Sequence, residues 1–218
     1  MRLERTLTSH AETERVAAAL APLLRAGDVL ALSGDLGAGK TTFVRALAGA
    51  LGIDAGLVSS PTYVIANQYP NSRGPRMAHI DAYRLSGADD LDAIGWDLLT
   101  DGSWIVAVEW PDRVGGIGGG AIERDAMEIR LEHGPIRDGA ESRHMAMTLP
   151  DAWVTRPELP ALIGAMRTGT RCPVTGEQVS PDAPFFPFSS ERARLADLNA
   201  WLTGGHTISG PLSAEEME

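Results

Sequence analysis

The sequence contains very little cysteine, few aromatic residues and no long hydrophobic run. Among its 218 residues only Cys172 carries a thiol, so neither an internal disulfide nor a cysteine-rich metal site is possible. No stretch approaches the ~18 consecutive apolar residues of a membrane-spanning helix, and the residues after Met1 lack the apolar core of a signal peptide. We therefore expect a soluble, cytoplasmic protein with no membrane partner.

Positive charge is also scarce. The chain has 19 Lys and Arg against 29 Asp and Glu, which gives a formal net charge of −10. Tight non-specific binding of nucleic acid needs clustered Lys and Arg at the phosphates, and this composition argues against it. A nucleic acid held by another subunit, or a basic protein partner, remains compatible with this charge.

The pattern of apolar runs is typical of an α/β protein. Ser9 and Glu12 have the spacing of a capping box at the start of a helix, and residues 28–33 form a short apolar run that suits a buried parallel strand. Further strands are expected at 63–69, 77–81, 104–110, 127–131 and 144–149, the last two antiparallel to each other. Further helices are expected at 43–51, 89–99, 161–166 and 189–202.

A phosphate-binding loop lies between the first apolar strand and the helix that follows it. The run GDLGAGKT, from Gly34 to Thr41, matches G-x-x-x-x-G-K-[ST] in full. Glycines let successive backbone N–H groups face one anion, and the helix adds its positive N-terminal end. Lys40 would contact the β- and γ-phosphates, the Thr41 hydroxyl would bind Mg²⁺, and Thr42 would lie near the α-phosphate.

Two acidic residues end neighbouring strands, where a P-loop protein needs a carboxylate near Mg²⁺ or the attacking water. Glu109 follows the apolar run 105–108, and Asp81 follows 77–80. Either could instead be a solvated strand end or a helix cap. Trp110 would stack near the nucleotide or fill the core. We expect His79 to be a satisfied structural histidine, not a base.

These elements predict a P-loop NTPase fold with a mostly parallel central sheet flanked by helices. Composition changes after Pro150, and residues 169–187 are rich in Pro and Gly. We therefore expect a P-loop ATPase domain over residues 1–150, a linker over 151–170, and a small appendage with an acidic tail over 171–218.

Four motifs, in order, resemble the TsaE family of bacterial tRNA threonylcarbamoyladenosine biosynthesis over about residues 5 to 150. The sequence carries SGDLGAGKTTF from Ser33, SSPTY from Ser59, HIDAYRL from His79 and VEWPDR from Val108. The resemblance implies an Mg²⁺-dependent ATPase associated with the two proteins that transfer threonylcarbamoyl to adenosine 37 of tRNAs reading ANN codons. Hydrolysis would reset that assembly, and tRNA would be contacted only indirectly.

The resemblance also implies roles for single residues. Glu109 matches the Mg²⁺-linked acid, Asp81 the acid needed for hydrolysis, and Thr62 lies in a loop that senses the nucleotide. Arg143 is our choice for a basic residue near the nucleotide, and Ser9 matches a segment that approaches the adenine. The implied nucleotide contacts are Ser9, Gly37, Ala38, Gly39, Lys40, Thr41, Thr42, Thr62, Trp110 and Arg143, with Thr41, Glu109 and Asp81 at the metal.

The C-terminal segment is similar to a small zinc-ribbon family that includes the DNA gyrase inhibitor YacG. The similarity places the four ligand positions at Cys172, Thr175, Ser189 and Ala193, and only the first is a thiol. A structural zinc site needs about four N or S donors, so we expect no zinc. The segment would then depend on apolar packing among Phe185, Phe186, Phe188, Leu195, Leu198 and Trp201.

Two other functions remain open from the sequence. A nucleotide-dependent binding switch with little turnover would rearrange residues 59–62 on ATP binding and use the C-terminal segment to recruit a partner. A small-molecule kinase is disfavoured because we find no Arg-rich acceptor lid, although Arg84 lies close to Asp81 in the sequence.

Overall fold

The computed structural model describes residues 1–61, 65–72, 74–136, 141–181 and 183–202, and the statements below concern these residues. The chain forms two compact units, Met1–Arg167 and Thr168–Glu218. The first unit therefore continues past the boundary that we expected at residue 150. Each unit is described by itself.

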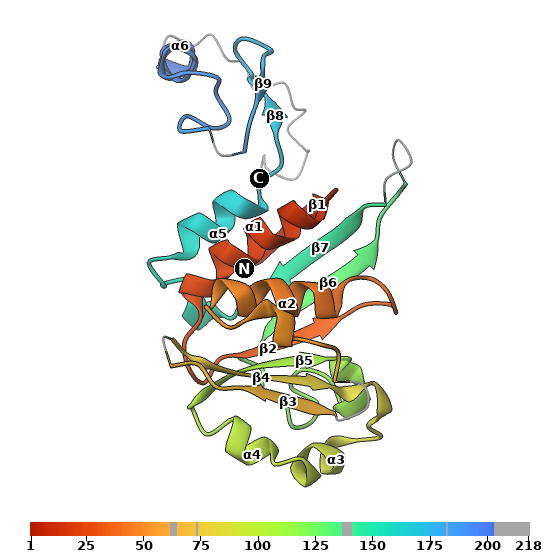
Figure 1. Ribbon diagram of the computed structural model, residues 1–218. Coiled ribbons are helices and arrows are strands. Elements are labelled where there is room, and N and C mark those ends of the chain that lie inside the picture. Colours follow the sequence, from red (N-terminus) through yellow and green to blue (C-terminus); the bar gives the residue numbers. More distant parts are fainter. Residues whose placement is uncertain (62–64, 73, 137–140, 182, 203–218) are drawn as a thin grey trace, which may run out of the picture. The chain divides into compact units, whose positions relative to one another are not determined.

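The first unit is built on one seven-stranded sheet (Figure 1). Its strand order is β1-β7-β6-β2-β5-β4-β3. The strands are β1 Arg2–Leu7, β2 Val29–Ser33, β3 Ala66–Tyr69, β4 Arg76–Asp81, β5 Trp104–Glu109, β6 Met127–His133 and β7 Arg143–Thr148. Four adjacent strands, β6, β2, β5 and β4, are parallel, whereas β7 and β3 run antiparallel to their neighbours. The expected α/β class, the parallel centre and the late antiparallel pair are confirmed.

Helices cover both faces of this sheet (Figure 1). One face is packed by α1 His10–Leu20, α2 Lys40–Ala50 and α5 Leu159–Met166, whose buried side chains share a core with β2 and β6. The other face of the central strands is packed by α3 Ala88–Ala93 and α4 Trp96–Leu99. Short 3₁₀ turns occur at Ala21–Leu23, Ala55–Leu57, Ala82–Arg84, Pro111–Val114 and Asp151–Trp153.

Two expectations about helices change in detail. The helix expected over residues 89–99 is interrupted at Gly95, whose φ of +83° is left-handed and separates α3 from α4. The capping box at α1 forms in part. Ser9 Oγ accepts a hydrogen bond from the Glu12 amide at 3.3 Å, whereas the Glu12 carboxylate accepts from Thr8.

Residues 151–167 are part of the first unit and not the linker that we predicted. Trp153 is 3% exposed and Leu162 is fully buried, both in the core shared with α1. Arg156 fixes this segment to the start of β2 by donating two hydrogen bonds to Asp28, at 2.5 and 2.8 Å. The prolines suggested a linker, but Pro160 lies in the first turn of α5, where a helix tolerates proline.

The second unit contains a two-stranded sheet and one helix. The strands β8 Thr170–Arg171 and β9 Gln178–Val179 are antiparallel, and α6 spans Glu191–Leu202. Its small core contains Cys172, Val179 and Ala193, with Phe186 and Phe188 packed against it. The larger aromatic cluster that we expected is wrong in part, because Leu195 and Trp201 on α6 are 52% and 56% exposed.

Within the described part of the chain, no helix is both long and apolar enough to span a membrane.

Candidate active site

The P-loop joins the carboxyl end of β2 to the first turn of α2, and its glycines are required by its shape. Gly34 has a φ of +132°, and a Cβ there would come 1.9 Å from the Leu131 carbonyl oxygen of β6. Gly39, the N-cap of α2, has a φ of +104°. Both conformations favour glycine, so the loop closes tightly against the sheet and turns its backbone toward the helix N-terminus.

Lys40 is held by the loop itself. Its Nζ donates hydrogen bonds to the carbonyl oxygens of Gly34 and Asp35 at 2.7 and 2.9 Å, and it lies 3.7 Å from the centre of the Trp110 ring. Burial lowers the pKa of Lys40, while the nearby carboxylates of Glu109, Asp81 and Asp35 act to raise it. The ammonium is therefore close to three acids and to the loop, where phosphate oxygens would compete for its hydrogen bonds.

Thr41 and the two predicted acids meet at the same edge of the sheet. Asp81 and Glu109 are paired across β4 and β5, and both side chains are buried. The Thr41 hydroxyl donates to Glu109 Oε1 at 2.7 Å, and Asp81 Oδ2 accepts from the Ser60 hydroxyl at 3.2 Å. A hydroxyl and two carboxylates are the hard oxygen donors that Mg²⁺ prefers, so this set fits a magnesium ion.

Trp110 is the residue after β5 and adopts a left-handed conformation, with φ 60° and ψ 50°. Such a conformation is strained for a non-glycine residue. Its ring lies over Lys40 Nζ and 5.1 Å from the Tyr83 ring, between centroids. Its backbone N–H donates to the Leu32 carbonyl at 3.0 Å, which holds the end of β5 next to the P-loop strand. Trp110 therefore contacts the phosphate-loop lysine and not only the core.

A cavity of about 270 Å³ brings together most of the residues expected around the nucleotide. It lies between the start of α1, the P-loop and β7. Ser9, Gly37, Ala38, Gly39, Thr42 and Arg143 line it. Leu7, which belongs to the same expected segment as Ser9, also lines it, whereas His10, Thr13, Leu131 and Glu141 were not expected. His10 and Thr13 follow Ser9 in the first turn of α1, and that proximity was the available signal.

Arg143 already has partners within its own strand region. Its guanidinium donates to the Glu141 carboxylate at 2.8 Å and to the Ser142 carbonyl at 3.0 Å. This pairing with Arg143 lowers the pKa of Glu141. The Ser9 hydroxyl accepts from the Glu12 amide, so it serves as a helix cap. Thr62, the remaining expected contact, lies outside the described residues, although Ser60 nearby contacts Asp81.

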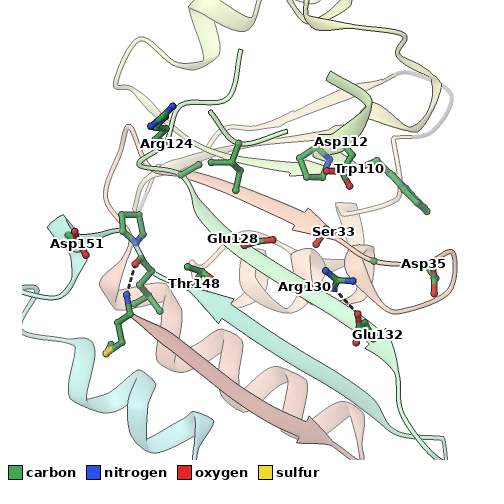
Figure 2. Close-up of a pocket in the computed structure, with 17 residues that line it drawn as sticks. Ser33, Asp35, Trp110, Asp112, Arg124, Glu128, Arg130, Glu132, Thr148 and Asp151 are labelled. Atoms are coloured by element: carbon green, nitrogen blue, oxygen red, sulfur yellow. Dashed lines mark hydrogen bonds and ion pairs between the residues drawn. The ribbon is translucent and has the colours of Figure 1, made fainter. Parts of the chain in front are cut away.

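A larger cavity, of about 800 Å³, lies on the opposite face of the sheet (Figure 2). Glu128, Arg130 and Thr148 face it from β6 and β7, and Asp35 and Trp110 border it beside the P-loop. Side chains alternate along β6, so Leu131 lines the smaller cavity while Arg130 lines this one. Of the expected nucleotide residues, six line the smaller cavity and Trp110 borders the larger one, whereas Lys40 and Thr41 line neither of the two.

Comparison with known proteins identifies the first unit. The family described as "Threonylcarbamoyl adenosine biosynthesis protein TsaE" matches residues 7–143. The chain belongs to the TsaE family. A Streptomyces coelicolor protein named "tRNA threonylcarbamoyladenosine biosynthesis protein TsaE" is 42% identical over 142 residues, which is 62% of this chain and 90% of that protein. A Bacillus subtilis protein of the same name is 36% identical over 137 residues, 63% of this chain and 79% of that protein.

A solved structure supports the fold. "Crystal structure of Bacillus subtilus YdiB" aligns with a TM-score of 0.56 at 24% identity, and covers 74% of this chain and 94% of that one. At this identity the likeness shows the fold alone, which agrees with the P-loop arrangement of β2 and α2. The first unit of this TsaE-family chain therefore has the expected P-loop NTPase fold.

The second unit matches a different family. The family described as "DNA gyrase inhibitor YacG" matches residues 170–218. Three of the four positions that resemble zinc ligands are joined by hydrogen bonds in the structure. The Thr175 amide donates to Cys172 Sγ at 3.4 Å, and the hydroxyls of Thr175 and Ser189 are 3.0 Å apart. The fourth, Ala193, is buried beside Cys172. Among the described residues, no group of three His, Cys, Asp or Glu is arranged to bind a metal.

Proposed function

We propose that this chain is the Mg²⁺-dependent ATPase subunit of the bacterial machinery that forms N6-threonylcarbamoyladenosine at position 37 of tRNAs reading ANN codons. One observation carries the proposal most strongly. Lys40, Thr41, Asp81 and Glu109 come from three separate motifs and meet at one edge of the sheet. Family membership supports the pathway, because the relatives are named for tRNA threonylcarbamoyladenosine biosynthesis.

The residues at the P-loop suggest how ATP would be held. The backbone amides at the start of α2 and the Lys40 ammonium would bind the phosphates, in place of the carbonyl contacts that Lys40 makes to Gly34 and Asp35. Thr41 and Glu109 would hold Mg²⁺, which supplies charge neutralisation across the β- and γ-phosphates when bound. The cavity at Ser9 and Arg143 has room for part of a nucleoside beside the loop.

Asp81 is the candidate for orienting the attacking water. Its carboxylate lies beside Glu109 in the sheet register, and it accepts hydrogen bonds from the Tyr83 amide at 3.1 Å and the Ser60 hydroxyl at 3.2 Å. These bonds fix the orientation of the carboxylate. An oriented carboxylate is suited to accept a hydrogen bond from water during phosphoryl transfer.

We further propose that the two threonylcarbamoyl-transfer proteins are the partners and that tRNA is contacted only through them. The net charge of −10 supports indirect contact with tRNA, since the chain repels phosphate on average. Hydrolysis would then reset the assembly between rounds of transfer.

The proposal is tested by ATP turnover, measured for the full chain with and without the two partner proteins. We expect the partners to increase turnover, and Asp81→Ala and Glu109→Ala to reduce it at least about 100-fold, the usual scale for losing a positioned acid. Glu123→Ala is the matched control, because Glu123 is an exposed acid that precedes β6 and lines neither cavity. The proposal would be wrong if the partner proteins left turnover unchanged and both active-site variants kept wild-type turnover.

A second candidate is a nucleotide-dependent binding switch with little turnover. The hydrogen bond between Ser60 and Asp81 favours it, because it links residues 59–61 to the acid beside the P-loop. The switch predicts that Glu109→Ala still binds ATP and still binds the partner in a nucleotide-dependent way. Loss of nucleotide dependence in Glu109→Ala, together with measurable wild-type turnover, favours the ATPase.

A further inference from the structure

His79 is a polar residue in the buried core of the first unit, where it contacts one of the two predicted acids. It is fully buried in β4, between Met77 and Asp81 on the same face of the strand. That face is packed by the P-loop helix α2 and also carries Glu109, the last residue of β5. His79 therefore lies two residues before Asp81 on β4, on the same face of the sheet as Asp81 and Glu109.

The His79 ring contacts the proposed metal acid directly. The Nε2 atom is 2.8 Å from Glu109 Oε1, the same oxygen that accepts the Thr41 hydroxyl at 2.7 Å. Glu109 is only 3% exposed, so these contacts replace water that the carboxylate has lost. One carboxylate oxygen is thus fixed from two sides, by a histidine behind it and by the P-loop threonine in front.

The other ring nitrogen shows that the contact comes at a cost. Among the described residues, His79 Nδ1 has no hydrogen-bond partner although it is buried. A buried polar atom without a partner is unfavourable, so the fully satisfied structural histidine that we expected is contradicted at Nδ1. The contact is a hydrogen bond from the ring to the carboxylate when Nε2 carries a proton.

We propose that His79 is a positioning residue that fixes the Glu109 carboxylate for Mg²⁺ and so sets how strongly Mg²⁺ increases nucleotide affinity. The proposal rests on the proposed role of Glu109 at the metal. Groups that orient a metal ligand from behind commonly change metal affinity by about 10- to 100-fold when removed. His79 acts on the proposed metal acid through the contact of its Nε2 atom with Glu109 Oε1.

The test is the ratio of ADP dissociation constants without and with Mg²⁺, measured by calorimetry on the full chain in EDTA and in magnesium. We expect His79→Leu to reduce this ratio about 10-fold or more. His79→Gln, whose amide nitrogen can take the place of Nε2, should keep the ratio within about threefold of wild type. The matched control is His144→Leu, because His144 lies on β7 with a side chain 38% exposed.

A double variant tests whether His79 acts through Glu109. In a Glu109→Ala background, adding His79→Leu should change the ratio no further, whereas an additional loss would overturn the proposal. An unchanged ratio in His79→Leu alone would also overturn it. If Mg²⁺ does not change the ADP affinity of the wild-type chain, the proposed Mg²⁺ role of Glu109 fails as well. If Mg²⁺ does change it, and Glu109→Ala abolishes this effect while His79→Leu leaves it intact, only the His79 proposal fails.

A spectroscopic measurement keeps the proposal falsifiable if His79→Leu does not fold. Nitrogen-15 NMR of the wild-type chain, labelled at histidine and free of metal, should show His79 with its proton on Nε2 and a bare Nδ1. Glu109→Gln should shift the Nε2 signal more than the Nδ1 signal. A proton on Nδ1 alone would overturn the proposal, because Nε2 could then not donate to the carboxylate.

Discussion

The two units of this chain differ in which residues occupy the positions that a family resemblance indicates. In the first unit, Lys40, Thr41, Asp81 and Glu109 lie close together beside the P-loop, and each is the residue type that the TsaE resemblance predicts there. In the second, the positions that resemble zinc ligands also meet, but Thr175, Ser189 and Ala193 stand where thiols are expected. Positions matched by a family resemblance can therefore converge in the fold even where the residues at those positions cannot perform the family's chemistry. The residue type at each matched position must be checked separately.

Hydrogen bonds connect three of the positions that resemble zinc ligands in the second unit. Burial raises the pKa of the Cys172 thiol, but hydrogen bonds from Thr175 and Ser189 outweigh it and lower the pKa to about 6. The thiol sulfur therefore accepts from the same two positions that would share a metal with it in the zinc family. The unit keeps a small apolar core around this cluster, with Cys172, Val179 and Ala193 buried.

The largest expected effect comes from restoring the zinc ligands. A variant with Thr175→Cys, Ser189→Cys and Ala193→Cys should bind one zinc ion, with apparent binding energy on the order of 10 kcal/mol at neutral pH. The wild-type chain should bind none. Two measurements test this prediction. One is the zinc content after dialysis, and the other is the urea concentration at which the NMR signals of α6 show half-unfolding, with and without EDTA. Adding Cys172→Ser to the triple variant should weaken binding, since one of four ligands is then lost. A triple variant without zinc would show that the four positions do not converge.

In the first unit, the substitution Gly34→Ala tests whether the P-loop closes against β6. The new methyl would meet the Leu131 carbonyl oxygen of β6, and the backbone would be held at a φ that alanine avoids. We expect destabilisation of about 3 kcal/mol or more, or failure to fold, measured by chemical denaturation. Gly87→Ala is the control, because a Cβ there meets no atom within 4 Å. Equal stability of the two variants would mean that the loop does not close on β6 as described.

Arg5 tests why residues 151–167 belong to the first unit. This buried arginine of β1 donates to the carbonyls of Ala165 and Arg167 at the end of α5, at 2.6 and 2.7 Å, and also to Glu12. Arg5→Met should destabilise the unit by about 2–3 kcal/mol, because buried carbonyls and a carboxylate lose their donor. Arg2→Met, at an exposed pair with Glu4, should cost no more than about 0.5 kcal/mol. Equal costs would contradict the buried anchoring.

A further prediction is a pH dependence confined to the second unit. Cys172 has a folded pKa of about 6 against an ordinary 9.0, so the folded unit binds fewer protons than the unfolded chain between these values. Its stability should therefore be complete above pH 9 and fall as the pH drops toward 6. The urea midpoint of α6 resonances at pH 6 and pH 8.5 measures this, and Cys172→Ser should remove the difference. A difference that survives the substitution would assign it to other groups.

The P-loop and the strand-end acids could be predicted because each is specified by local sequence. Gly34–Thr41 carries its own backbone requirements, and Asp81 and Glu109 each follow an apolar strand. The strand β1 was missed because its inward positions are Leu3, Arg5 and Leu7, and a buried arginine hides the alternation. Its partner carbonyls lie on α5, far away in the sequence, so no local pattern announces them.

Other misses have equally physical causes. The break between α3 and α4 depends on Gly95, which a helical spacing of apolar residues does not reveal. Leu195, Leu198 and Trp201 were expected to pack because α6 offers them at helical spacing, yet the small core around Cys172 leaves all three exposed. The link between His79 and Glu109 joins two motifs through tertiary contact, and only the structure shows it.

A complementation experiment in cells tests whether the first unit uses its P-loop to support threonylcarbamoylation of tRNA. In a bacterium depleted of its own TsaE-family protein, the threonylcarbamoyladenosine content of tRNA can be measured by mass spectrometry after expression of this full chain. We predict that the wild-type chain restores the modified nucleoside and that Lys40→Ala, which removes the charge held over Trp110, does not. Equal restoration by both chains would contradict the account.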